Sequence, residues 1–260
     1  MPTRRDDVVE TLHGVTVVDP YRWLEDGASE EVRAWSTAQT SYTEALLAGK
    51  PGFDKLTARL DALLRIGSVE PPSVVVRKKG PPRYFYRRQG PNDDQPVLYV
   101  RDGEGGADRV LIDPNRMSED KTTSLDWWAP SWDGKLLAYG LSEGGDENST
   151  LRVLDVDGGH DLGKAEVISR VRYASIAWLP DNRGFYYSRF PAAGTVPEGE
   201  ERYHRKIYLH ALGRSPDEDP LVFGEGRPMT DTPSIDLSPN GRWLVTTVHQ
   251  AGAAASCTCS

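Results

Sequence analysis

The sequence has almost no cysteine, and the two that it has stand together at its end. Cys257 and Cys259 fall within the last four residues, and the first 256 residues contain none. A disulfide framework and a structural zinc site are therefore excluded for the body of the chain, because both need several spaced cysteines. No His-Glu-x-x-His segment or other ligand spacing suggests a catalytic metal. We expect neither a metal nor a cofactor.

Long apolar runs and a basic stripe are also missing. The first ten residues, MPTRRDDVVE, include no apolar core of a signal peptide, and no run approaches the roughly 18 apolar residues of a membrane span. The net charge is −8, and the densest basic run is only RKKG at 77–80. These absences predict a cytoplasmic protein that has neither a membrane nor a nucleic acid as its partner.

The sequence does have enough apolar material for a core. Hydrophobic residues make up 38% of the 260 residues and aromatic residues 9%, which argues against wholesale disorder. Between 28 and 66, apolar residues recur at helical spacing, with Ser29 as N-cap and with Gly49 and Pro51 ending a first helix. We expect two helices there, whose apolar stripe includes Val32, Trp35, Tyr42, Leu46, Phe53, Leu56, Leu60, Leu63 and Leu64.

From about residue 73 the period changes to two. Short segments rich in Tyr, Val and Leu, such as RYFYRR, LLAYGLS and FYYSRF, are separated by Gly, Pro, Asp and Asn turns, with no helical stretch between them. A unit made of a strand end, a turn and a second strand occurs three times, as SWDGKLLAY at 131, WLPDNRGFYY at 178 and LSPNGRWLV at 237. A spacing of about 50 residues is typical of four-stranded propeller blades, which must stack on neighbours to bury both faces.

The two periods divide the chain. We expect a mainly β fold, in which an N-terminal helical arm over 1–72 precedes an incomplete β-propeller over 73–250. About three blades should be complete, with a fourth barely begun. The last ten residues, AGAAASCTCS at 251–260, break the strand pattern and form an aberrant tail.

The segment GLSEG at 140–144 matches Gly-x-Ser-x-Gly, the nucleophile elbow of serine hydrolases. That elbow needs a strand before the serine and a helix after it. The strand KLLAY precedes Ser142, but the turn GGDENST and another strand follow it. We therefore interpret Ser142 as part of a hairpin loop between blade strands, and we expect no catalytic residue in this chain.

Histidine does not rescue the catalytic interpretation. The order Ser, Asp, His could be filled formally by Ser142, Asp181 and His204 or His249. Those positions fall on turns and strands of different blades, with nothing to bring them together. His210 alternates within KIYLHAL and is predicted to lie on a blade face.

One long stretch points to a family. HGVTVVDPYRWLED at 13–26, followed by SEEVRAWSTAQT, resembles the N-terminal signature of the prolyl oligopeptidase family. The similarity continues in order through VLYVRD, VLIDPNRMSED, LAYGLSEGG, IAWLPDNRGFYYSRFP and KIYLHALG, to about His249 and Gln250. Members of this family are serine peptidases that hydrolyse short peptides, typically after proline. Their α/β-hydrolase domain carries the catalytic Ser, Asp and His in the C-terminal part, and a seven-bladed propeller caps it.

The resemblance implies that this chain holds the N-terminal arm and the first half of the propeller. In the complete endopeptidase that part would gate the access of short proline-containing peptides, and the chain alone should be inactive. The alternative is a stand-alone, non-catalytic, propeller-like binding module. The family tends to carry an aromatic residue just before the AW strand, in the outer part of the substrate pocket. Here that residue is Tyr173 in RYASIAW, although a packed strand aromatic would fit the position equally well.

The resemblance also bears on the loop after Ser142 and on the tail. Members often have a Ser-Asp-Trp-like turn where this chain has GGDENST. In the family, His-Gln is usually followed by a segment like Gly-Trp-Ser-x-Ser-Glu-Leu-Tyr-Leu. If the codon of Ser256 is AGC, reading the tail two nucleotides later permits Glu-Leu-Tyr-Leu. We hypothesise that residues 251–260 are translated out of frame.

Overall fold

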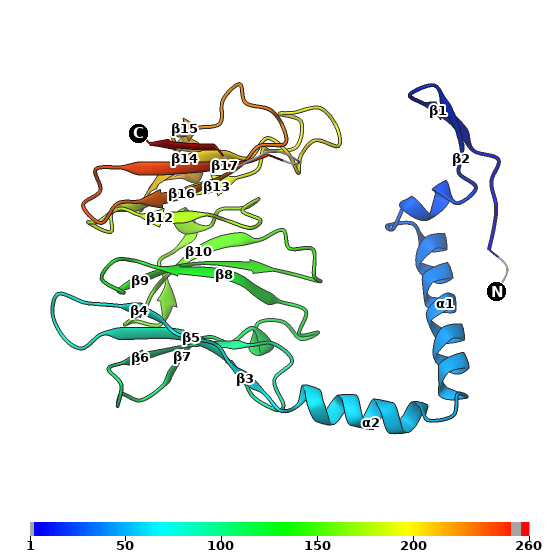
Figure 1. Ribbon diagram of the computed structural model, residues 1–260, viewed down its shortest axis with the longest axis horizontal. Coiled ribbons are helices and arrows are strands. Elements are labelled where there is room, and N and C mark those ends of the chain that lie inside the picture. The colour runs from blue at the N-terminus through cyan, green and yellow to red at the C-terminus, as the bar shows by residue number, and fades with distance from the viewer. Residues whose placement is uncertain (1–2, 251–255, 260) are drawn as a thin grey trace. The chain divides into compact units, whose positions relative to one another are not determined.

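The computed structural model describes residues 3–250 and 256–259, and it divides into two compact units, Met1–Ile66 and Gly67–Ser260. Figure 1 labels the two helices and most of the strands. The first unit contains helices and one hairpin, and the second consists of antiparallel sheets joined by turns and short 3₁₀ helices.

The helices of the first unit are α1 (Glu30–Ala48) and α2 (Phe53–Leu64). The hydroxyl of Ser29 accepts a hydrogen bond from the backbone N–H of Val32 at 3.1 Å, so the predicted N-cap is confirmed. Gly49 is the C-cap of α1, also as predicted. Neither helix contains a buried residue. The apolar stripe seen in the sequence is therefore present and mostly exposed, although Val32, Trp35 and Phe53 are half-buried.

A short hairpin precedes the helices, although the sequence interpretation placed only a helical arm there. Its strands are β1 (Val9–Leu12) and β2 (Val15–Val18), which pair antiparallel. His13 and Gly14 form the two-residue turn with φ values of +50° and +80°, as the tightest hairpins require. A 3₁₀ helix, η1 (Arg22–Glu25), then leads towards α1.

The second unit consists of four antiparallel sheets, named here blades 1 to 4 in chain order, which lie stacked in Figure 1. Blade 1 contains β3 (Ser68–Val69), β4 (Ser73–Val75), β5 (Arg83–Gln89), β6 (Val97–Asp102) and β7 (Arg109–Ile112). Blade 2 contains β8 (Ser124–Pro130), β9 (Leu136–Ser142), β10 (Thr150–Asp155) and β11 (His160–Asp161). Blade 3 contains β12 (Ile176–Trp178), β13 (Gly184–Arg189), β14 (Lys206–Ala211) and β15 (Leu221–Phe223). Blade 4 contains β16 (Thr232–Leu237), β17 (Leu244–His249) and β18 (Ser256–Cys259). The 3₁₀ helices are η2 (Pro114–Arg116), η3 (Lys164–Glu166) and η4 (Pro216–Glu218).

Neighbouring blades bury their facing side chains in three apolar clusters. In β9, Leu137 and Tyr139 belong to the cluster between blades 1 and 2, whereas Ala138 belongs to the one between blades 2 and 3. Ile207 and Ile235 join blades 3 and 4 in the same way. Strand alternation thus supplies both faces of a blade, and the predicted mainly β fold of stacked blades is confirmed.

Two expectations concern the end of the chain. The fourth blade was expected to be barely begun, but its backbone forms three strands, because β18 pairs with β17. The hypothesis of an out-of-frame tail falls largely on residues 251–255 and 260, which lie outside the described residues.

The described part of the chain contains neither a membrane-spanning helix nor a metal-binding cluster. None of its helices is long and apolar enough to cross a membrane. Within the same residues, no group of three or more His, Cys, Asp or Glu side chains is placed to hold a metal ion.

Candidate functional site

Ser142 has the surroundings of a structural residue. It is the last residue of β9, and a turn and then β10 follow it, so the helix of a nucleophile elbow is missing. Its hydroxyl donates a hydrogen bond to Asp126 Oδ1 at 2.9 Å, and the residue is only 4% exposed. Ser142 therefore belongs to the strand rather than to the expected hairpin loop, and it is not available to attack a substrate.

The two glycines of the GLSEG motif also have local explanations. A Cβ atom on Gly140 would lie 2.3 Å from Cε2 of the Trp127 ring, so only glycine leaves room for this indole. The Trp127 Nε1–H donates to the carbonyl of Val171 at 3.2 Å, which holds the ring in place. Gly144 has a φ of +61°, in the left-handed region that favours glycine. The motif is therefore produced by packing and turn geometry.

The formal triad is not assembled either. Asp181 lies in the turn between β12 and β13. The Nε2 atom of His204 is 2.6 Å from Glu200 Oε2, in the loop before β14. His249 is the exposed last residue of β17. The three candidate residues thus lie on separate turns, loops and strands, and no described contact joins any of them to Ser142.

His210 is the most buried histidine, and its partners are structural. It lies in β14 with no exposed surface, as its alternation in the sequence predicted. Its Nδ1 atom is 3.0 Å from Asp219 Oδ2, which also accepts a hydrogen bond from the Tyr187 hydroxyl at 2.9 Å. Burial and the Asp219 charge raise the pKa of Tyr187 above its ordinary value. The cluster holds the turn before β15 against β13 and β14.

Tyr173 has the strongest marks of a functional residue. It lies just before β12, and its φ of +47° places a bulky side chain in the left-handed region. Such a conformation costs about 1–3 kcal/mol and tends to occur at functional sites. Its side chain is not buried inside a blade, because the residue is 58% exposed. The structure therefore places Tyr173 at the surface rather than inside a blade.

A charged cluster surrounds the Tyr173 ring. Its hydroxyl donates to Glu147 Oε2, which also accepts from Arg172 Nη2. The Arg172 guanidinium lies 4.8 Å from the centroid of the Tyr173 ring. Hydrogen bonds from Tyr173 and Arg172 lower the pKa of the Glu147 carboxyl. Arg205 supports the strained backbone, because Nη1 donates to the Tyr173 carbonyl at 3.2 Å and Nη2 to the Arg172 carbonyl at 3.1 Å.

Tyr173 opens onto a pocket of about 360 Å³ at the ends of blades 3 and 4. This pocket, the Tyr173 pocket, is lined by Arg172, Tyr173, Phe190, Arg202, Tyr203, Arg205, Met229, Thr230, Asp231 and Thr232. Aromatic rings and guanidinium groups together form a surface that can accept a peptide, with apolar contact for its side chains and hydrogen-bond donors for its carbonyl oxygens.

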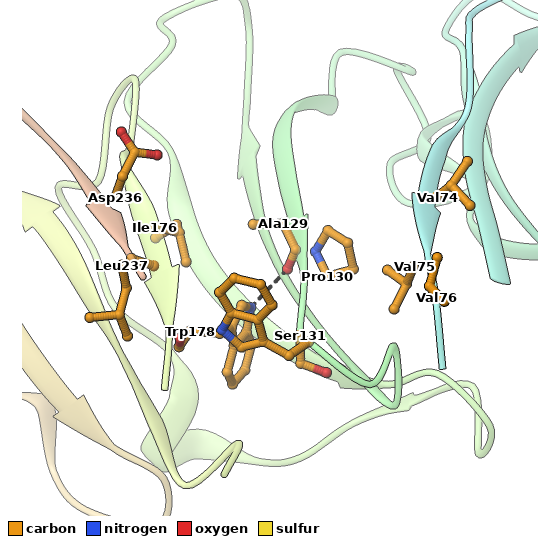
Figure 2. A pocket seen from close by; sticks show the side chains of 12 residues that line it. Val74, Val75, Val76, Ala129, Pro130, Ser131, Ile176, Trp178, Asp236 and Leu237 are labelled. Atoms are coloured by element: carbon orange, nitrogen blue, oxygen red, sulfur yellow. Dashed lines mark hydrogen bonds between the residues drawn. The ribbon is translucent and has the colours of Figure 1, made fainter. Parts of the chain in front are cut away.

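A second hollow, of about 460 Å³, runs across strands of all four blades (Figure 2). Val75, Pro130, Ile176 and Leu237 each contribute an apolar side chain to its wall. The indole N–H of Trp178 donates to the Ala129 carbonyl at 3.0 Å, the interaction drawn as a dashed line in Figure 2. Among the described residues that line this hollow, Asp236 is the only titratable one, so it offers no acid–base pair for catalysis.

Comparison with known proteins identifies the family. The model of the prolyl oligopeptidase N-terminal β-propeller domain matches residues 1–256. This chain belongs to the prolyl oligopeptidase family. A prolyl endopeptidase of Elizabethkingia meningoseptica is 35% identical over 224 residues, which are 85% of this chain and 30% of the relative. Prolyl oligopeptidase A of Galerina marginata is 31% identical over 275 residues, covering 94% of this chain and 36% of the relative.

Solved structures of the family agree. A structure from an analysis of two prolyl endopeptidases and their inter-domain dynamics has a TM-score of 0.88 and 38% identity, covering 100% of this chain and 38% of that one. Prolyl oligopeptidase B from Galerina marginata, bound to a 35-residue substrate, has a TM-score of 0.75 and 25% identity, covering 96% and 37%. The chain thus spans about a third of the length of the relatives that it matches, and it corresponds to their N-terminal propeller portion.

The sequence singled out Tyr173 but none of its neighbours. Arg172 and Arg205 lie 33 positions apart, and Glu147 belongs to the loop after β9. Nothing in their spacing indicates that they meet. A departure from the usual family turn in GGDENST was the only signal, because it drew attention to the loop that supplies Glu147.

Proposed function

We propose that this chain serves a prolyl oligopeptidase-like serine endopeptidase as its gating propeller portion, and that Tyr173 contacts the peptide that is admitted. The observation that carries the proposal is the strained and exposed Tyr173, held by Arg205 at the mouth of a pocket. A bulky residue in this backbone conformation is retained at a cost, which a role in binding explains. Membership of the family favours this function over that of a stand-alone binding module.

The side chains that are present determine which steps of peptide hydrolysis this chain can perform. The described residues contain no assembled Ser–His–Asp set, so they can admit and orient a peptide but cannot attack its carbonyl. In the proposal, peptide-bond hydrolysis is carried out by a hydrolase domain like that of the family. Short proline-containing peptides are its substrates, and the blades exclude larger folded proteins.

The experiment has two readouts. The purified chain is incubated with a proline-containing chromogenic peptide, and we expect no release of the chromophore. Binding of a blocked Gly-Pro peptide is measured by calorimetry in the wild type and in Tyr173→Ala. Tyr42→Ala is the control, since Tyr42 is a similarly exposed tyrosine of the first unit. We expect binding to weaken in Tyr173→Ala only.

Two results would contradict the proposal. Hydrolysis that disappears in Ser142→Ala would show that the GLSEG serine is a nucleophile after all. Unchanged peptide binding in Tyr173→Ala would show that this ring is only a surface residue of the blade.

A further inference from the structure

Four arginines gather around Tyr173 at one end of blades 2 and 3. Arg172, Arg202 and Arg205 line the Tyr173 pocket. An adjoining hollow of about 250 Å³ is lined by Arg170, Arg172 and Arg202, together with Asp146 and Glu201. The family resemblance drew attention to the aromatic ring here and not to this concentration of positive charge.

Among the described residues, only one of these four arginines is in an ion pair. Arg172 is paired with Glu147. Among the residues that the structure describes, Arg202 and Arg205 are in no ion pair. Among the described residues that line the Tyr173 pocket, Asp231 is the only carboxylate, and its Oδ2 atom already has a counter-charge in Arg227, whose Nε atom is 2.6 Å away.

The pKa of the Arg205 guanidinium reflects its burial and the nearby positive charge. Burial lowers the pKa of its guanidinium, and the nearby positive charge of Arg172 lowers it further. The Nε atoms of Arg170, Arg172 and Arg205 are buried with no hydrogen-bond acceptor. A cation that loses hydration without gaining a counter-charge is destabilised, and an anion in the pocket would relieve that cost.

Within the arginine cluster, the Arg205 side chain is held in place by its contacts, whereas the Arg202 side chain is not. Arg205 is held by its two hydrogen bonds to backbone carbonyls and by the Phe190 ring, 4.6 Å from its guanidinium carbon. Arg202 is exposed, in the loop between β13 and β14, and no described side chain pairs with it. Planar guanidinium groups bind carboxylates through paired hydrogen bonds, so an anion suited to this site is planar and carries two oxygens.

We propose that Arg172, Arg202 and Arg205 form a carboxylate subsite beside Tyr173, which recognises an acidic side chain or the terminal carboxylate of a bound peptide. The subsite rests on the proposed function, in that the peptide lies against Tyr173. It makes the chain selective for peptides that carry a negative charge close to the residue held by the tyrosine ring.

The test compares matched peptides by calorimetry. The neutral probe is acetyl-Ala-Gly-Pro-Gln-Ala-amide, the second probe replaces Gln by Glu, and the third has a free terminal carboxylate in place of the amide. We expect at least one charged probe to bind about tenfold more tightly than the neutral one, as a charge-assisted pair provides. The difference should shrink in about 0.5 M salt, which screens the charges, and the two charged probes identify the source of the carboxylate.

Arg202→Gln is the decisive variant, because Arg202 supports no described contact and its loss should not disturb folding. We expect the tenfold preference to fall to about threefold or less. Arg205→Gln should remove it as well, but that change also releases the Tyr173 backbone. The control is Arg183→Gln, an exposed arginine in the turn at the far end of β12, whose ion pair is with Asp181.

The outcomes separate this proposal from the proposed function. If all three peptides bind equally and in a Tyr173-dependent way, the carboxylate subsite is wrong and the peptide site stands. If no peptide binds but N-acetylglutamate binds and loses affinity in Arg202→Gln, the subsite stands and the peptide site is wrong. If N-acetylglutamate does not bind either, both are overturned.

Discussion

The two units of this chain bury their apolar residues to very different degrees. In the blades, Leu137 and Phe185 have no exposed surface, and each lies in a cluster shared by two sheets. In the helical unit, Leu46 is 48% exposed and Leu64 is 81% exposed. The comparison shows that a clear periodic pattern fixes which face of an element is apolar but not what covers that face. Burial needs a second surface, which each blade finds in the next one.

The largest expected effect comes from removing a side chain between two blades. Leu137→Ala should lower the free energy of unfolding by about 2–5 kcal/mol, because it leaves a cavity in the cluster between blades 1 and 2. Leu46→Ala is the matched control on α1 and should change it by less than about 1 kcal/mol. Urea denaturation followed by circular dichroism measures both. Equal effects would show that the helical stripe is buried after all.

The next largest effect is expected on the stability of the folded chain at acid pH. A hydrogen bond from Arg83 is the main cause that lowers the pKa of Asp102 in the folded chain. The stabilisation by this pair is therefore present above the ordinary carboxyl pKa of about 3.9 and is lost as the pH falls through the lower folded value. Arg83 also donates to the Gly134 carbonyl, so the pair helps to join blades 1 and 2.

This effect is measured as the urea midpoint between about pH 5 and about pH 2. Asp102→Asn should be less stable than the wild type at neutral pH and should lose less stability on acidification. Asp54→Asn, in the first turn of α2, is the control in the other unit. A wild type and an Asp102→Asn variant with parallel pH profiles would contradict the role of the pair.

A smaller effect is expected on self-association. The uncovered stripe of α2 includes Leu56 and Leu60, which are 59% and 49% exposed. Contiguous apolar surface of this kind drives association, so the chain should form oligomers that Leu56→Glu with Leu60→Glu shifts towards the monomer. Lys55→Glu is the control, since it changes charge on the same helix without touching the stripe. Sedimentation velocity measures the distribution, and a wild type that is monomeric at micromolar concentration would refute the expectation.

The smallest effect is a gain in stability. Tyr173→Gly relieves a left-handed backbone conformation and should raise the free energy of unfolding by up to about 1 kcal/mol, while peptide binding falls. Tyr208→Gly, in β14, is the contrasting variant and should destabilise the chain, because its ring packs against Tyr187. If Tyr173→Gly destabilises the chain to the same degree, the ring has a packing role and its strain does not indicate function.

Sequence patterns were most informative where a local rule determines the outcome. The N-cap at Ser29 and the alternation of Leu137 and Ala138 are properties of short segments, and both are as predicted. The hairpin at Val9–Val18 was missed because the helical interpretation of the following residues was extended over it. The pairing of Arg205 with the backbone at Tyr173 could not be predicted, because it depends on how two distant loops meet at the end of a blade.

The β-ladders of the described chain end at the border of each blade, and no ladder joins one sheet to the next. Blades 2 and 3 are joined instead by side chains that reach a backbone carbonyl: the Trp178 indole donates to Ala129, and the Trp132 indole donates to Trp178 at 2.7 Å. Mechanically, each blade is held together by a ladder of backbone hydrogen bonds, whereas neighbouring blades are held together by side-chain contacts. A force that separates two blades is resisted by single side-chain hydrogen bonds, from tryptophan or arginine, and by apolar contacts. A force that shears one blade must break a whole ladder of backbone hydrogen bonds. Under force, neighbouring blades should therefore separate from one another before any single sheet unfolds.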